Sequence, residues 1–321
     1  RGPTINAIRE LNPNALAIAE EMDRIRAQAR QGRPPRSRAA PRLGPLFGIP
    51  VLLKDNVNTR DMPTTAGSVA LRGSIPLDDA FIAKKLRAAG AIILGKANLT
   101  EFANYLTNGM PAGYSSLGGY VFNPYNPIAQ PGSDGRPALS PGGSSSGSAA
   151  AVAANLVTVA VGTETSGSIL SPGNQNSVVG IKPTVGLISR EGIIPIAASQ
   201  DIAGPFGRTV ADAAILLGAL TGIDPNDPIT SESAGRSFSD YTPFLQPGAL
   251  LFARIGVPRA NYWTGLNAGQ RQIMEDAVAR LRSLGAQVFD ADIPTSGMQG
   301  GRGSYVLQYE FNATSTPTWL R

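Results

Sequence analysis

Short apolar runs alternate with helical segments along most of the chain. Residues 48–54 form an apolar run with β-branched members that ends in a charge, which predicts a buried strand. Residues 79–89 predict a helix with Gly90 as its C-cap, and 91–94 predict the next strand. The same order of helix, glycine and strand returns at 281–289. This alternation indicates an α/β fold with a mixed, mostly parallel central sheet that is covered by helices on both faces.

Other segments extend this plan. Asn12 followed by Pro13 predicts the start of a helix that runs to about Gly32. Two further strands are predicted at 156–161 and 250–257, and a helix capped by Thr209 is predicted at 209–220. The longest predicted loops, which in compact domains tend to carry sites, are 109–140 and 224–246.

The composition removes most of the usual catalytic chemistry. The 321 residues include no His and no Cys, which excludes a Ser-His-Asp triad, a His-rich metal site and a thiol nucleophile. A nucleophile must therefore be Ser, Thr, Lys, Tyr or a carboxylate, and a general base must be Lys, Tyr, Asp or Glu. A hydrophobic content of 42% with 16% charged residues is typical of a globular protein.

The net charge of +5 does not indicate a nucleic-acid partner. Many of the arginines lie within residues 24–42, where no aromatic residues are interleaved, so this segment is interpreted as a solvated linker. The longest apolar stretch, 149–162, is shorter than the ~20 residues of a membrane span and predicts a buried helix. Nothing in the sequence assigns a compartment or an oligomeric state.

Two Gly/Ser-rich segments flank one predicted helix and strand, at 140–148 and 162–172. Such segments present backbone N–H groups and hydroxyls into a cleft, as in a phosphate site, a packing joint, or a serine nucleophile with its oxyanion hole. The phosphate-binding pattern G-x-x-x-x-G-K-[ST] is absent, because Gly95-Lys96 is followed by Ala97. A serine nucleophile needs a base, and Lys54 ends an apolar strand, where burial would lower the pKa of a lysine.

At these segments the chain resembles the amidase signature family. The resemblance rests on blocks in the family's order and at its spacing: 48–56, 95–103, 141–148, 162–169, 180–186, 199–205 and 208–212. Within the family the chain is most similar to the bacterial peptide amidase branch, on Glu164, the serine run 144–146 and residues 187–195.

The resemblance implies a Ser-cisSer-Lys triad. In this triad Ser168 is the nucleophile, Ser144 is the bridging serine after a cis peptide bond, and Lys54 is the base. It assigns the oxyanion hole to the backbone N–H groups of Thr165, Ser166, Gly167 and Ser168. Ser145 corresponds to a hydroxyl that supports the lysine, and Ala103 to a position whose backbone lines the pocket. Ser166 departs from the family, which usually has Asp or Gly there.

The resemblance also implies an activity: hydrolysis of a carboxamide through an acyl-enzyme, with no cofactor and no metal. The expected substrate is a small-molecule or peptide amide, with peptide C-terminal amides as the first choice. The alternatives are a hydrolase of aryl or fatty acid amides, an amidotransferase A-type subunit, and an inactive or truncated homologue that acts as a binding scaffold. No nucleic-acid partner and no membrane span are expected.

The expected organisation is a single amidase domain over 1–321. Residues 1–42 form its N-terminal helix and Arg-rich loop, 48–220 its catalytic core, and 221–321 a peripheral segment on the substrate side. Because the family implies a longer protein, we expect this last segment to be incomplete and the fold to be truncated at its C-terminal end.

Overall fold

The computed structural model describes residues 5–32, 43–106, 109–294 and 306–313. The chain divides into two compact units, one of Arg1–Thr242 with Glu310–Arg321 and one of Pro243–Tyr309. The organisation of the whole chain as a single amidase domain stays a prediction.

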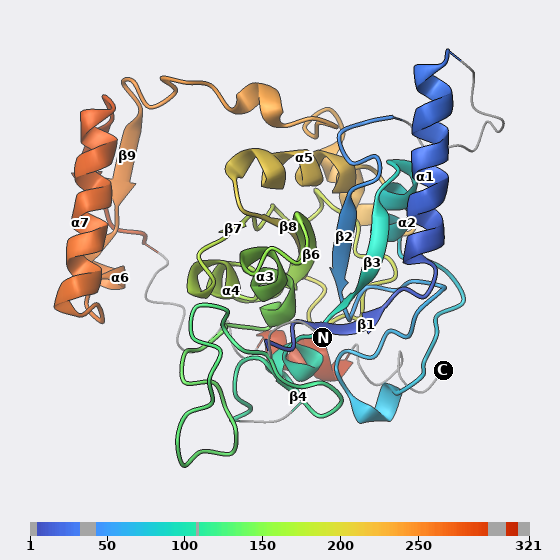
Figure 1. The fold of residues 1–321 in the computed structure, drawn as a ribbon. Coiled ribbons are helices and arrows are strands. Elements are labelled where there is room, and N and C mark those ends of the chain that lie inside the picture. The colour runs from blue at the N-terminus through green and yellow to red at the C-terminus, as the bar shows by residue number, and fades with distance from the viewer. Residues whose placement is uncertain (1–4, 33–42, 107–108, 295–305, 314–321) are drawn as a thin grey trace. The chain divides into compact units, whose positions relative to one another are not determined.

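A six-stranded mixed sheet forms the centre of the first unit (Figure 1). Its strands, in spatial order, are β1 (Ile8–Leu11), β3 (Ile92–Ala97), β2 (Pro50–Lys54), β6 (Val159–Glu164), β8 (Ile202–Gly207) and β7 (Val179–Gly180). β2 pairs in parallel with both β3 and β6, whereas β1, β8 and β7 join antiparallel. The carboxyl ends of β2 and β6 therefore lie side by side, the place where open α/β sheets bind ligands.

Helices cover both faces of this sheet, as predicted. They are α1 (Ala15–Arg30), α2 (Phe81–Ala88), α3 (Ser146–Ala153), α4 (Leu170–Gln175) and α5 (Val210–Leu220). α2 and α5 pack on the face that carries Leu53 and Val161. α3 packs on the opposite face, which carries Leu52 and Ala160. Because side chains alternate along a strand, Lys54 points to the same face as Leu52, toward α3.

The predicted start of α1 is wrong by two residues. Asn14 is the N-cap, although its side chain makes no capping hydrogen bond. The Asn12 side chain turns inward instead, where its amide donates to the Ile93 carbonyl oxygen at 2.9 Å. The prediction for α5 is confirmed, since Thr209 and Asp212 form a capping box at its first turn.

The predicted strand 156–161 is also displaced, because β6 begins at Val159 and continues to Glu164. Leu156 is 37% exposed, whereas Thr163 and Glu164 are buried. An apolar run thus marks the middle of this strand and misses its polar carboxyl end, which is the end that builds the site.

The remaining elements of the first unit are short: η1 (Val69–Leu71), η2 (Glu101–Asn104), β4 (Tyr114–Ser115), β5 (Gly119–Tyr120) and η3 (Pro228–Ser233). Near the sequence boundaries between the units lie η4 (Thr242–Phe244) and the helical residues 306–313. Within the described ranges, no helix combines the length and the apolar character that crossing a membrane requires.

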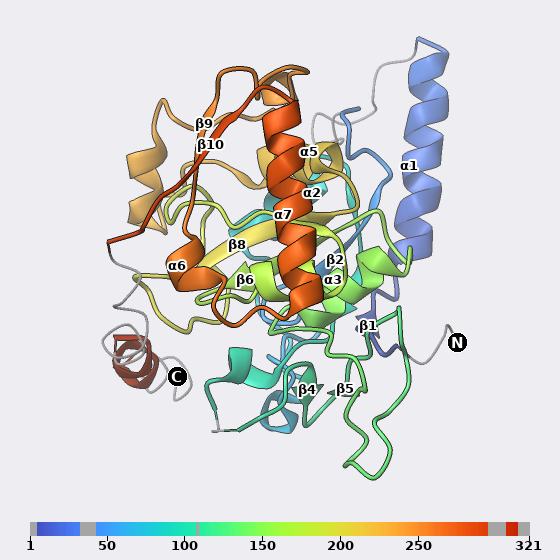
Figure 2. The ribbon, with the colours of Figure 1, turned by 90° about the vertical axis from the view of Figure 1, so that its left-hand side faces the viewer.

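The second unit is built on two parallel strands, β9 (Arg254–Val257) and β10 (Gln287–Asp290), with α7 (Ala268–Ser283) beside them (Figure 2). The short helix α6 (Arg259–Tyr262) follows β9. Val257, Trp263 and Val278 form its core cluster. The predicted strand 250–257 is only half strand, because residues 250–253 form the turn that leads into β9.

Candidate active site

Lys54 ends β2 and is fully buried. Its Nζ lies 2.7 Å from Ser144 Oγ and contacts Thr163 twice, at 3.2 Å from the carbonyl oxygen and 2.9 Å from Oγ1. Burial lowers the pKa of Lys54 from 10.5 to about 7, although the negative charges of Asp201 and Glu164 raise it. A lysine with this pKa is partly neutral at pH 7 and can act as a general base.

Ser144 is held in place by its backbone. The peptide bond between Gly143 and Ser144 is cis, and the Ser144 carbonyl oxygen accepts a hydrogen bond from Thr100 N at 3.0 Å. A Cβ atom on Gly143 would lie 2.6 Å from Thr100 Oγ1, so only glycine lets the segment pass this closely. The Ser144 side chain, 2% exposed, therefore reaches Lys54 from the segment that leads into α3.

Ser168 lies beyond the carboxyl end of β6, in the turn that leads into α4. Ser145 N donates to the Ser168 carbonyl oxygen at 3.2 Å, which joins the two serine-bearing segments. Within the described part of the chain the Ser168 hydroxyl has no hydrogen-bond partner, which leaves it available to a substrate. The link from Lys54 to Ser144 is thus present in the structure, and the next link, from Ser144 to Ser168, belongs to our proposal.

Glu164 organises the turn around the predicted oxyanion hole. Its buried carboxylate accepts hydrogen bonds from Gly167 N at 2.8 Å, Ile169 N at 2.8 Å and Leu170 N at 3.0 Å. The Gly167 amide, one of the predicted oxyanion donors, is therefore already bound in this structure. The predicted donors left for that role are the N–H groups of Thr165, Ser166 and Ser168.

Ser145 reaches the lysine through Thr163. Its Oγ donates to the Thr163 carbonyl oxygen at 3.0 Å and accepts from Thr163 N at 3.2 Å. That carbonyl oxygen is also an acceptor for Lys54.

Ala103 lies in η2 with φ +53, and its N–H donates to the Thr100 carbonyl oxygen at 3.0 Å. Its role in lining a substrate pocket stays a prediction.

Asp201 lies close to the site and contacts Thr165, one of the predicted oxyanion donors. Its carboxylate accepts hydrogen bonds from the Thr165 hydroxyl and from the backbone N–H groups of Ile196 and Ala197. Burial raises the pKa of Asp201, and these hydrogen bonds oppose the rise. Asp201 also lines a cavity of about 200 Å³ whose wall includes Thr163.

Sequence reasoning missed Asn56 and Thr163 as members of the site. Asn56 Nδ2 donates to Thr163 Oγ1 at 2.9 Å, and both side chains are buried. A signal was present, since each is a polar residue just at or beyond the end of an apolar strand. Hydropathy alone does not distinguish such residues from the start of a solvated loop.

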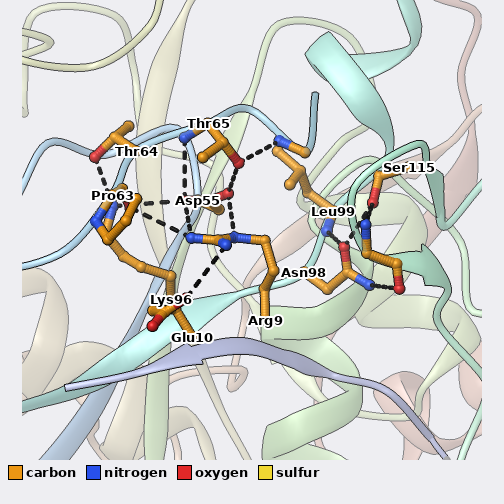
Figure 3. Close-up of polar contacts among 12 residues, drawn as sticks. Arg9, Glu10, Asp55, Pro63, Thr64, Thr65, Lys96, Asn98, Leu99 and Ser115 are labelled. Atoms are coloured by element: carbon orange, nitrogen blue, oxygen red, sulfur yellow. Dashed lines mark hydrogen bonds and ion pairs between the residues drawn. The ribbon is translucent and has the colours of Figure 1, made fainter. Parts of the chain in front are cut away.

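A second lysine, Lys96 in β3, is also buried, and its partners in the described part of the chain include no serine (Figure 3). Lys96 Nζ donates to Thr64 Oγ1 at 2.8 Å and to the Val57 carbonyl oxygen, and it lies 3.7 Å from Asp55. Asp55 also faces Arg9, whose Nε is 2.6 Å from its Oδ2. Burial lowers the pKa of Lys96 to about 8, while the charge of Asp55 raises it. These contacts give Lys96 a structural role and leave Lys54 as the candidate base.

Replacing Asp55 by Asn should destabilise the fold by about 3–5 kcal/mol, because Arg9 and Lys96 would remain buried without their shared acid. Urea unfolding followed by circular dichroism measures this loss. Asp78→Asn is the matched control, since it removes a carboxylate from an exposed ion pair with Lys84 and should leave the free energy of unfolding nearly unchanged. Equal effects of the two substitutions would contradict the stabilising role of the cluster.

Comparisons with known proteins match the sequence and the fold of this chain to one family. Residues 2–312 match the family model described as Amidase. The crystal structure of native peptide amidase from Stenotrophomonas maltophilia is 47% identical and superposes with a TM-score of 0.85, covering 98% of this chain and 59% of that one. An amidase family protein from Bacillus anthracis is 39% identical, with a TM-score of 0.83 over 96% of this chain and 56% of that one.

A sequence relative of a different kind is the A-type subunit of the glutamyl-tRNA(Gln) amidotransferase of Cyanothece sp. It is 40% identical over 294 residues, which is 91% of this chain and 55% of that protein. The chain spans about half the length of the curated relatives that it matches.

Proposed function

The chain belongs to the amidase family, and from this premise we propose that it hydrolyses a carboxamide through an acyl-enzyme on Ser168. The observation that carries the proposal is the 2.7 Å contact between Lys54 Nζ and Ser144 Oγ, made by a fully buried lysine with a pKa of about 7. Neutral lysine is the only state of this residue that can accept a proton.

The proposed reaction moves one proton along three residues. Ser144 gives its hydroxyl proton to Lys54 and takes one from Ser168, whose oxygen attacks the amide carbonyl carbon. The N–H groups of Thr165, Ser166 and Ser168 stabilise the oxyanion, an effect worth about 3–4 kcal/mol per donor in other enzymes. Ser144 then protonates the leaving nitrogen and regains its own proton from Lys54, and ammonia departs. Water hydrolyses the ester on Ser168 by the same route, which yields the free acid.

For the substrate we propose the C-terminal amide of a peptide. The support is the 47% identity, over 98% of this chain, with the peptide amidase of Stenotrophomonas maltophilia. A second candidate is the role of an amidotransferase subunit, which the 40% identity with such a protein supports. A third is a binding scaffold that does not activate its serine. These three candidate functions differ in which compounds react with Ser168.

Intact mass spectrometry after treatment with a phosphonyl fluoride, a reagent for activated serines, tests the proposal. We expect one adduct, located on Ser168 by peptide mapping, and loss of the adduct in Lys54→Met. A panel of amides scored by ammonia release then ranks peptide amides against aryl and fatty acid amides. Absence of an adduct would favour the scaffold, and an adduct without turnover of free amides would favour the amidotransferase role.

A further inference from the structure

Among the described residues, the Lys54 ammonium group contacts three hydrogen-bonding oxygen atoms, and this number constrains where its protons can lie. They are Ser144 Oγ, the Thr163 carbonyl oxygen and Thr163 Oγ1. A protonated lysine carries three N–H donors, so the ammonium form satisfies all three contacts. A neutral lysine carries two N–H groups and one lone pair, so one contact must reverse. Lys54 can act as a base toward Ser144 only if the contact that reverses is the one with Ser144.

The two Thr163 oxygens differ in what they can do. The carbonyl oxygen can only accept, so one lysine N–H stays with it in both protonation states. The hydroxyl can accept or donate, and a Thr163 hydroxyl that donated to Lys54 would occupy the lone pair needed by Ser144. The distance of 2.9 Å from Lys54 Nζ to Thr163 Oγ1 is the usual length of an N–H···O bond. The 2.7 Å contact with Ser144 is shorter.

Asn56 gives the Thr163 hydroxyl its orientation. Its Nδ2 donates to Thr163 Oγ1 at 2.9 Å, so that oxygen receives an N–H from each side when Lys54 also donates to it. The Thr163 proton must then point elsewhere. Both residues line the cavity of about 200 Å³, and the buried Asn56 Oδ1 has no partner among the described residues. A water molecule in this space can accept the Thr163 proton and donate to Asn56 Oδ1.

We propose that Thr163 and Asn56 are positioning residues for Lys54: they retain two of its N–H bonds in the neutral state and so direct its lone pair at Ser144. The inference rests on the proposed function, because it assigns the two residues to the base of that reaction. Asn56 does not contact the lysine in this scheme and acts through Thr163. The proposal has two measurable consequences, one for the pKa of Lys54 and one for the alignment of its lone pair with Ser144.

The pKa of Lys54 is measured without any turnover. The chain has five lysines, 54, 84, 85, 96 and 182, so the ¹³Cε signal of Lys54 can be assigned by substitution and titrated by NMR. Thr163→Val removes an acceptor of the ammonium form and should lower the pKa of Lys54 by about one unit, the size of one charge-assisted hydrogen bond. Thr163→Ser keeps the hydroxyl and should restore the native value. Thr59→Val is the matched control, since Thr59 is a buried threonine whose hydroxyl has no partner among the described residues.

Alignment is measured by turnover at pH values above the pKa of Lys54, where the lysine is neutral in every variant. There Thr163→Val should reduce kcat by about 10- to 100-fold with little change in KM, because misalignment of the base loses part of the 10²- to 10⁴-fold that general base catalysis typically contributes. Asn56→Leu should cause a smaller loss of kcat, and the double variant should lose no more kcat than Thr163→Val alone.

A native pKa of Lys54 and a native kcat plateau in Thr163→Val would overturn the proposal, provided that its melting temperature shows a folded protein. Additive losses in the double variant would overturn the assignment of Asn56. If no amide is turned over, the proposed function fails, and the titration still decides the contact of Thr163 with Lys54.

Discussion

Ser168→Ala should reduce amide hydrolysis by about 10⁴- to 10⁶-fold, as loss of a serine nucleophile does in other hydrolases. The substitution removes only a hydroxyl that has no hydrogen-bond partner in the described part of the chain, so the fold should be unaffected. The Ser168 backbone N–H and its carbonyl bond to Ser145 remain. Substrate affinity should therefore stay close to native while acylation is lost.

Ammonia release and intact mass after phosphonyl fluoride treatment check this expectation together. Ser171→Ala is the matched control, since it removes an exposed serine hydroxyl three residues further on, in α4. We expect native activity and a normal adduct in the control. Residual activity above about one per cent in Ser168→Ala would mean that another group attacks the amide.

Lys54→Met should reduce activity about 10³-fold at pH 8, because a side chain of similar length replaces the only base that contacts Ser144 in the described structure. The native pH profile should fall about tenfold per unit below pH 7, since protonated Lys54 cannot accept a proton. The variant should lack this acid limb. Initial rates from pH 5 to 9 measure both effects, and Lys84→Met, at an exposed lysine, should leave the native profile unchanged.

The same lysine links the stability of the fold to pH. An unfolded chain keeps Lys54 protonated up to about pH 10.5, whereas the folded chain releases that proton near pH 7. Between these values the unfolded state binds more protons, so the native free energy of unfolding gains about 1.4 kcal/mol per pH unit from this group. Lys54→Met has no such gain, and its stability relative to the native chain should therefore decline from pH 7 to 10. A constant difference would contradict the lowered pKa.

The α/β architecture and the segments that meet at the site could be predicted from the sequence. The apolar run that ends at Lys54 predicts β2, and alternation places helices on both faces of the sheet. The roles of Ser144 and Ser168 came from the resemblance to a family, because the composition of a Gly/Ser-rich segment does not by itself distinguish a serine nucleophile from an anion site or a packing joint. Their activation remains a proposal that the adduct experiment tests.

What sequence reasoning missed are contacts made by buried polar groups. The Glu164 carboxylate accepts a hydrogen bond from the Gly167 amide, which the resemblance assigns to the oxyanion hole. The sequence around these two residues does not predict that hydrogen bond. Asn56 and Thr163 meet only because β2 and β6 are parallel neighbours. Strand pairing is a long-range property, so hydropathy along the chain carries no information about it.

Lys54 and Asp55 are consecutive residues with different partners: Lys54 contacts Ser144 and Thr163, and Asp55 contacts Arg9 and Lys96. A deletion of one residue within β2 would move Asp55 to the position that Lys54 holds, and an insertion would move Lys54 to the position that Asp55 holds. After the deletion the acid would face Ser144, and after the insertion a third cation would join Arg9 and Lys96. Evolution can therefore vary the side chains along this strand one at a time, but it cannot change the strand's length by a single residue without losing the base and the ion cluster together.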